Sequence, residues 1–157
     1  MNPVIIVVLG IIGISVLAHL ARNHSLRRQV LGVHHEFISS DEFHERWADG
    51  LKYREQSGCY ALFFYEKQIN PYSLKQRKRF KTLYVGQSKD LFFRVHEHFS
   101  GRGNDGVMRL LNHGTPAYAV FLPCGLWRMN EYEKALIKAF RANRNGLNIQ
   151  AGGGKER

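Results

Sequence analysis

The stretch from residue 80 to residue 99 restricts the fold more than any other part of the chain, because a strand pattern passes directly into a helix pattern. In its first half, Leu83 and Val85 alternate with Thr82 and Tyr84. This alternation predicts a β-strand through residues 80–86 whose two faces meet different neighbours. The glycine at its end, Gly86, permits a sharp exit from the strand.

The second half of the stretch has helical spacing. Ser88 is a residue type favoured at helix N-caps. The apolar row of this helix consists of Leu91, Val95 and Phe99. Arg94 and His98 flank the row and should lean toward the sheet. An arginine held there loses hydration unless an anion compensates its charge. Two interpretations stay open: a structural ion pair, or a site that binds an anion.

Two other segments complete the predicted sheet. Residues 58–65 are apolar on both strand faces, which is typical of a central strand that is covered on each side. A third strand is expected through residues 118–122, between Pro116 and Pro123. A short helix is expected at residues 107–111, and a longer one from Asn130 to about Arg141.

Glu133, in that longer helix, has two interpretations. It lies three residues after Asn130 and could complete a capping box. It also shares a helix face with three apolar residues, Leu136, Ile137 and Phe140. Glu131, by contrast, should face solvent. A carboxylate on the apolar edge of a helix is a candidate ligand for a hard divalent cation.

The chain is basic, with a net charge of +10, and the surplus lies in its second part. Residues 58–157 hold 17 Lys and Arg against seven Asp and Glu. This favours a polyanionic partner, nucleic acid or an anionic membrane surface, over a surplus that serves solubility alone. Residues 67–81 contain no acid and carry Lys67, Lys75, Arg77, Lys78, Arg79 and Lys81. The same loop could lie along a phosphate backbone or simply be solvated.

The N-terminal segment is apolar. No charged side chain occurs from Met1 to Ala21, and residues 4–20 are almost wholly apolar. A helix of that length reaches just across a bilayer core of about 30 Å. Arg22, Arg27 and Arg28 follow it, and the positive-inside rule then places the rest of the chain in the cytoplasm. We therefore expect residues 3–21 to contact the membrane as an uncleaved single-pass anchor; a buried core helix is the alternative.

The chain thus divides into four predicted parts. Residues 1–30 are the transmembrane anchor with a basic juxtamembrane segment, and residues 31–57 are a spacer. In the spacer, Ser39 and Glu42 have capping-box spacing at the start of a helix. Residues 58–150 form the main domain, and the glycine-rich residues 151–157 form a flexible tail.

Six motifs, in this order, resemble the GIY-YIG nuclease family over about residues 57–150. They are Gly58-Cys59-Tyr60, Tyr84-Val85-Gly86, Arg94, His98, Glu133 and Asn148. Two features depart from the family pattern. Cys59 stands where isoleucine is usual, and the basic loop lengthens the gap between the two triplets.

The resemblance implies an α+β fold, with a three-stranded antiparallel sheet flanked by helices, and hydrolysis of phosphodiester bonds with one Mg²⁺ or Mn²⁺ ion. Glu133 would hold the ion, Tyr84 would activate water as general base, and Arg94 would neutralise charge on the phosphate. Tyr60 and His98 would position water and phosphate, and Asn148 would fix the phosphate or support the glutamate. The chain is therefore expected to be a membrane-anchored endonuclease acting on DNA. The alternative is an inactive module that tethers nucleic acid at the membrane.

Overall fold

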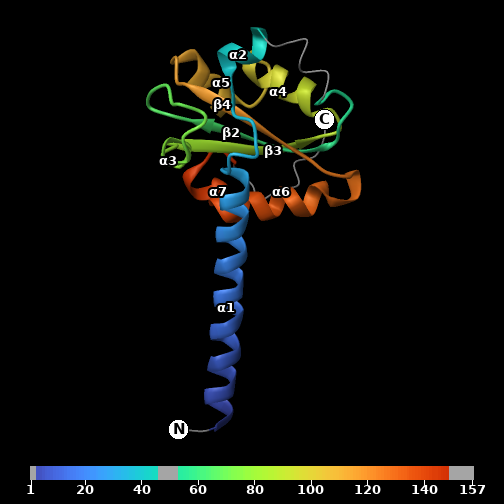
Figure 1. The fold of residues 1–157 in the computed structure, drawn as a ribbon. Coiled ribbons are helices and arrows are strands. Elements are labelled where there is room, and N and C mark those ends of the chain that lie inside the picture. The colour runs from blue at the N-terminus through green and yellow to red at the C-terminus, as the bar shows by residue number, and fades with distance from the viewer. Residues whose placement is uncertain (1–2, 46–52, 149–157) are drawn as a thin grey trace.

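A head built on one β-sheet and a long helix that extends from it make up the molecule (Figure 1). The computed structural model describes residues 3–45 and 53–148, and for residues 3–14 the backbone alone. The long helix is α1 (Pro3–Val30). The predicted tail at residues 151–157 lies outside the described residues, as does part of the predicted spacer.

The sheet has four antiparallel strands in the order β1-β4-β2-β3. They are β1 (Ile38–Ser39), β2 (Gly58–Phe64), β3 (Thr82–Ser88) and β4 (Ala117–Pro123). Every residue of β2 is buried, because this strand has a neighbour on each side and helices over both faces. That position explains its unbroken apolar sequence. β3 is an edge strand, and one side of its backbone is open to other partners.

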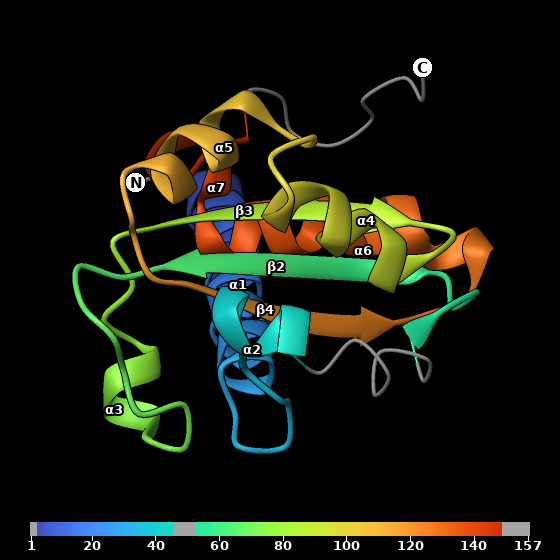
Figure 2. The ribbon, with the colours of Figure 1, turned by 90° about the horizontal axis from the view of Figure 1, so that it is seen from above.

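Helices cover both faces of the sheet, as the view from above shows (Figure 2). The end of α1 packs on one face together with α6 (Leu126–Phe140) and α7 (Ala142–Asn145). The other face is covered by α2 (Ser40–Glu45), α4 (Leu91–Phe99) and α5 (Asp105–Asn112). Alternate residues of β2 therefore enter two cores: Ala61 and Phe63 belong to the first, and Tyr60 and Leu62 to the second.

The architecture is α+β, but the sheet has one strand more than the three predicted. The added strand, β1, pairs with β4 through Ile38 opposite Ala119 and Ser39 opposite Tyr118. Two residues are too few to show any alternation, so the sequence held no periodic signal for it. The helix after β1 starts with the capping box that was expected. Ser39 Oγ accepts from the Glu42 backbone N–H at 3.1 Å, and the Glu42 carboxylate accepts from the Ser39 backbone N–H at 3.2 Å.

Two helix starts differ from the predictions, and both differences bear on the site. α4 is capped by Asp90, whose carboxylate accepts from the Phe93 N–H at 2.9 Å; β3 continues through Ser88. α6 begins at Leu126, one turn before the expected Asn130. Glu133 consequently lies inside the helix and caps nothing, which removes the capping interpretation of this residue.

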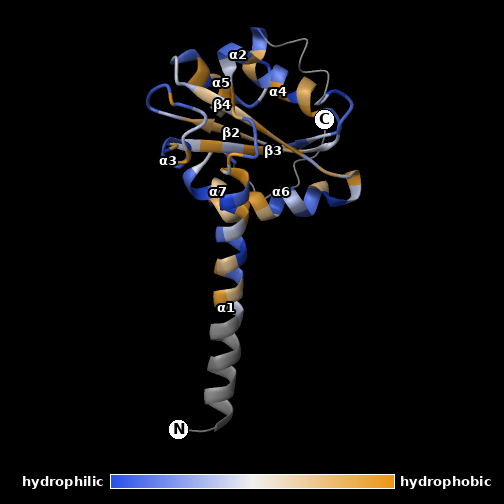
Figure 3. Ribbon diagram, viewed as in Figure 1, coloured by the Kyte–Doolittle hydropathy of each residue, from blue (hydrophilic) through white to orange (hydrophobic). Residues whose placement is uncertain are grey.

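The transmembrane prediction is contradicted. Within the ranges that the structure describes, no helix is long and apolar enough to cross a membrane. α1 does not stop at the end of the apolar run but continues without a break to Val30, which is fully buried in the head. The last turns of α1 carry polar residues, which Figure 3 draws in blue, and they pack against α6. The Arg27 guanidinium there lies 5.5 Å from the Phe140 ring centre. The anchor at residues 3–21, the single-pass membrane localisation and the cytoplasmic orientation that followed from it are therefore not retained.

Candidate functional site

Tyr60 and Gly86 lie opposite each other on β2 and β3, and their pairing explains the glycine. A Cβ built on Gly86 would lie 2.3 Å from the Tyr60 hydroxyl oxygen and 2.5 Å from the ring carbon that bears it. Gly86 does not form a turn, as the sequence led us to expect, but lies within β3. It leaves the space in which the Tyr60 phenol crosses the neighbouring strand.

The Tyr60 hydroxyl meets His98, which α4 places above the sheet. The hydroxyl oxygen is 2.8 Å from His98 Nε2, and both side chains are almost fully buried. Nδ1 of the same ring accepts a hydrogen bond from the Asn104 backbone N–H at 3.1 Å. The neutral ring therefore carries its proton on Nε2 and donates it to Tyr60. Burial, reinforced by Arg94, lowers the pKa of His98 to about 4, so the imidazole is neutral at pH 7.

A second phenol, Tyr84, completes an aromatic cluster with these two residues. Its ring centre is 6.2 Å from that of Tyr60 and 5.1 Å from that of His98. Burial raises the pKa of Tyr84; Arg94 and a hydrogen bond with Tyr60 oppose this rise, and Glu133 adds to it. Burial also raises the pKa of Tyr60 well above its usual value. Both phenols hold their protons at neutral pH.

Arg94 lies on α4 beside this cluster and is partly open to solvent. Its Nη1 donates to the Glu97 carboxylate at 2.7 Å, and 41% of the Arg94 side chain is exposed. Its positive charge lowers the pKa values of Tyr60, Tyr84 and His98. Arg94 thus forms the ion pair that one interpretation expected, with Glu97 as its partner. The anion-binding interpretation stays a prediction.

Glu133 approaches the same phenols from α6, on the other side of the sheet. The residue is only 8% exposed. Its carboxylate acts on the pKa values of Tyr60, Tyr84 and the neighbouring Cys59, raising all three. Arg94 and Glu133 thus influence one pair of tyrosines with opposite signs, although they stand on helices that cover opposite faces.

Asn148 is also near β3, but its side chain is engaged by the backbone. Its Oδ1 accepts from the Val85 N–H at 2.9 Å, and its Nδ2 donates to the Val85 carbonyl at 2.7 Å. This pair of bonds closes the open edge of β3 in the way that another strand would. The structure therefore gives Asn148 a supporting position beside Tyr84 rather than a free amide that faces the phenols.

The donor set near Glu133 bears on the predicted metal ion. Across residues 3–45 and 53–148, no group of three or more His, Cys, Asp and Glu side chains could enclose a cation. Mg²⁺ is often bound by one or two carboxylates, completed by water and substrate phosphate. A single buried glutamate fits that mode and does not fit a closed protein cage.

Several residues that shape this site were not among the predicted site residues. Glu97 could have been found, because it follows Arg94 at the i, i+3 spacing of helix ion pairs. Gly103 had no recognisable signal, yet a Cβ there would lie 2.1 Å from His98 Nδ1. The Gln87 amide donates to Asn130 Oδ1 at 2.7 Å and links β3 to α6 one turn before Glu133.

The predicted basic loop lies at the other end of the β2–β3 hairpin and does not join the cluster. Four of its five predicted contact residues are exposed: Lys75, Lys78, Arg79 and Lys81. Arg77 is the exception, with only 2% exposure. Its guanidinium donates to the carbonyls of Pro71 and Gly32 and lies 4.2 Å from the Phe37 ring centre. Arg77 thus holds the loop against the rest of the domain, and its buried side chain is not accessible to nucleic acid.

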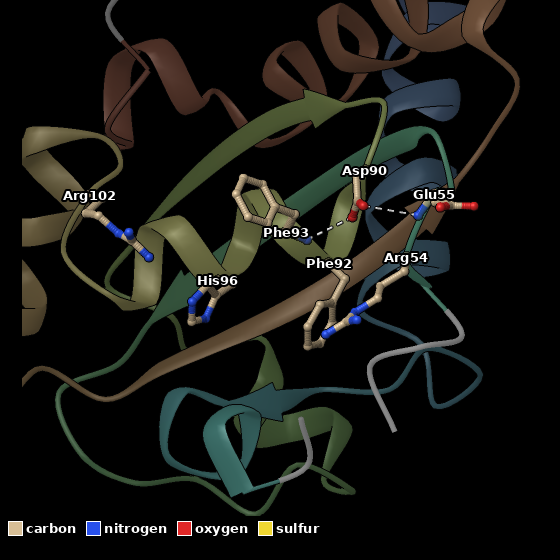
Figure 4. Close-up of a pocket in the computed structure, with 7 residues that line it drawn as sticks. All are labelled: Arg54, Glu55, Asp90, Phe92, Phe93, His96 and Arg102. Atoms are coloured by element: carbon tan, nitrogen blue, oxygen red, sulfur yellow. Dashed lines mark hydrogen bonds between the residues drawn. The ribbon is translucent and has the colours of Figure 1, made fainter. Parts of the chain in front are cut away.

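An open depression of about 570 Å³ lies on the outer side of α4 (Figure 4). It is lined by Arg54, Glu55, Asp90, Phe92, Phe93, His96 and Arg102. Both carboxylate oxygens of Asp90 are used locally, by the Phe93 and Glu55 backbone N–H groups. None of the predicted catalytic residues lines this depression, and we assign it no part in the site.

No protein-family model matches the chain, and neither the curated proteins nor the solved structures include a match.

Proposed function

We propose that the chain is a divalent-metal-dependent endonuclease that hydrolyses phosphodiester bonds of nucleic acid, with DNA as the substrate. One observation carries the proposal. Two adjacent phenols, the buried Tyr60 and the partly buried Tyr84, feel a positive charge from Arg94 and a negative charge from Glu133. A carboxylate that could bind a cation, a guanidinium that could bind a phosphate and a phenol that could exchange a proton are the groups that hydrolysis of a phosphodiester needs.

Each side chain has a role that follows from its environment. Arg94 would bind a phosphate oxygen, for which the phosphate must compete with the Glu97 carboxylate. Glu133 would hold a Mg²⁺ or Mn²⁺ ion, and that ion when bound would polarise the phosphate and stabilise the leaving oxygen. Tyr84 would act as general base only after losing its phenolic proton to solvent, which the charge of the bound ion would favour; the phenolate would then accept a proton from the attacking water. Tyr60, hydrogen-bonded to His98, would help to position that water.

One observation favours a second candidate, an inactive nucleic-acid-binding module. Burial raises the pKa of both phenols, so neither is a base at neutral pH without a further positive charge. A module of this kind would bind through the same basic surface and cleave nothing. Its binding would weaken steeply as salt rises, because bound phosphates release counterions.

A panel of cleavage assays on the full-length chain distinguishes the nuclease from the inactive binding module. Supercoiled plasmid, linear duplex, branched and single-stranded DNA are incubated with Mg²⁺, Mn²⁺ or EDTA. We expect metal-dependent cleavage that falls roughly a hundredfold or more in Glu133→Gln. Glu131→Gln is the matched control, because Glu131 is exposed on the same helix. Equal cleavage by both variants would refute the role of Glu133, and binding without cleavage under any metal would support the inactive module.

A further inference from the structure

The loop between β2 and β3, residues 67–81, presents an aromatic side chain together with a group of cations; we call it the basic arm. Its exposed cations are Lys67, Lys75, Lys78, Arg79 and Lys81. Tyr72, at the turn before α3 (Leu74–Arg77), is 84% exposed, and Leu74 is 43% exposed. Few large aromatic side chains in a folded domain stand so far out in water.

Hydrogen bonds hold the basic arm in one conformation at both of its ends, which we call the first and the second leg. In the first leg, the Tyr118 hydroxyl donates to Gln68 Oε1 at 2.6 Å and accepts from the Ile69 N–H at 3.2 Å. In the second leg, the Arg77 carbonyl accepts from the Tyr65 hydroxyl at 2.9 Å, while the Arg77 guanidinium is inserted below the arm. A solvated loop that served only solubility would need none of these bonds.

The tip itself is also fixed. Asn70 Oδ1 accepts from the Tyr72 N–H at 2.9 Å, and Gln76 Oε1 accepts from the Asn70 N–H at 2.6 Å. These bonds hold the backbone at Tyr72 in one conformation, in which its side chain is 84% exposed. An aromatic ring on a fixed backbone loses little conformational entropy when it binds a flat partner.

Burial of the Arg77 guanidinium costs hydration free energy, which contacts within the folded chain must offset. Burial lowers the pKa of Arg77, which means that the charged form loses hydration in the folded chain. The bonds to Gly32 and Pro71 and the contact with the Phe37 ring compensate part of that loss. A buried cation, which is costly to desolvate, thus fixes the shape of a surface loop that carries an exposed tyrosine.

The arm lies at the opposite end of the β2–β3 hairpin from the Tyr60–His98 pair, but it continues directly into β3, the strand that carries Tyr84. Its last cation, Lys81, precedes Tyr84 by three residues, which is about 10 Å along a strand. A polyanion on the arm therefore reaches Tyr84 within a few nucleotides.

We propose that the basic arm binds single-stranded nucleic acid, with Tyr72 stacked on an unpaired base and the flanking cations on phosphates. Sequence-tolerant binding to single strands combines a cationic surface with aromatic rings on which bases stack. Bases in a duplex are not available for such stacking. The inference builds on the proposed function and gives its substrate class: nucleic acid that is unpaired beside the bond to be cut.

The test measures binding without cleavage. The full-length chain with Glu133→Gln is titrated, in EDTA, against a fluorescein-labelled oligothymidine of about 20 nucleotides and against a duplex of the same length. Tyr72→Ala should weaken binding of the oligothymidine about tenfold and leave duplex binding within about twofold. Tyr72→Phe keeps the ring and should bind both probes like the parent. Lys78→Gln should weaken both probes and reduce the salt slope by about one.

Two results would overturn the inference: unchanged oligothymidine binding in Tyr72→Ala, or an equal loss for both probes. Failure here and failure of the nuclease proposal are distinguishable. A chain that cleaves DNA while Tyr72→Ala binds normally contradicts only the arm. A chain with the expected selectivity that never cleaves contradicts only the nuclease.

Discussion

The Tyr60 phenol crosses the backbone of Gly86, so that a Cβ on this glycine would stand 2.3 Å from the hydroxyl oxygen. The same hydroxyl is 2.8 Å from His98 Nε2. A strand residue without a side chain thus allows a tyrosine on one strand to reach a histidine on a helix. The hydrogen bond between Tyr60 and His98 therefore requires that residue 86 has no side chain.

Gly86→Ala should therefore move the Tyr60 ring and break its bond to His98. Overpacking of a buried site of this kind costs about 1–3 kcal/mol of unfolding free energy, to be measured by urea denaturation. The matched control is Gly125→Ala, whose Cβ would meet only the exposed Trp127 side chain, at 3.1 Å. A Gly86→Ala protein as stable as the control, with normal cleavage, would contradict this account.

His98 should make the fold sensitive to acid. Its pKa is lowered to about 4 in the folded chain, from 6.5 in a free side chain. Between these values the unfolded chain binds a proton that the folded chain does not, so stability falls as pH drops from 6.5 to 4. The loss can reach about 3 kcal/mol. The loss of unfolding free energy between pH 6.5 and 4 should be smaller in His98→Gln than in His113→Gln, a control at an exposed histidine. Denaturant unfolding at successive pH values measures it. Parallel curves for the two variants would refute the assignment.

Asn148→Ala should affect stability more than chemistry. The change leaves the buried Val85 N–H and carbonyl without the two bonds that Asn148 supplies. We expect the unfolding free energy to fall by about 1–3 kcal/mol, while the dependence of cleavage on metal concentration stays the same. Asn143→Ala, at an exposed position of α7, should change neither. A normal stability with a shifted metal dependence would instead place Asn148 in the chemistry.

Arg77 and Lys78 are neighbours with opposite expected behaviour. Arg77→Gln should lower the unfolding free energy by roughly 2–4 kcal/mol, because buried carbonyls lose a charged donor. The Arg77→Gln change should also speed chymotrypsin cleavage after Tyr72 or Leu74, because the arm loses the bonds from the Arg77 guanidinium that hold it. Lys78→Gln should leave both unchanged and weaken nucleic-acid binding. If Arg77→Gln is as stable and as resistant as Lys78→Gln, the arm is not held in the way we describe.

Much of the candidate site was predictable because its signals are local. Helical spacing alone put Arg94 and His98 on the inward edge of α4 and Glu133 on the buried face of α6. Other features left no local signal. The two-residue strand β1 is too short for a pattern, and Gly103 is required only by a ring five residues earlier in the chain.

The sequence by itself determined the periodic elements, the choice of inward faces and the order of the six motifs, since these depend on neighbours within a few positions. Only the tertiary structure decided which cation of the basic arm is buried. Arg77 looks like its neighbours in sequence, but its carbonyl partners at Leu31 and Gly32 lie 46 and 45 residues earlier. Only the tertiary structure, likewise, decided that Arg94 and Glu133 act on the pKa values of the same two phenols. The free energy of a buried polar group depends on the groups that long-range folding places around it, and no local pattern records them.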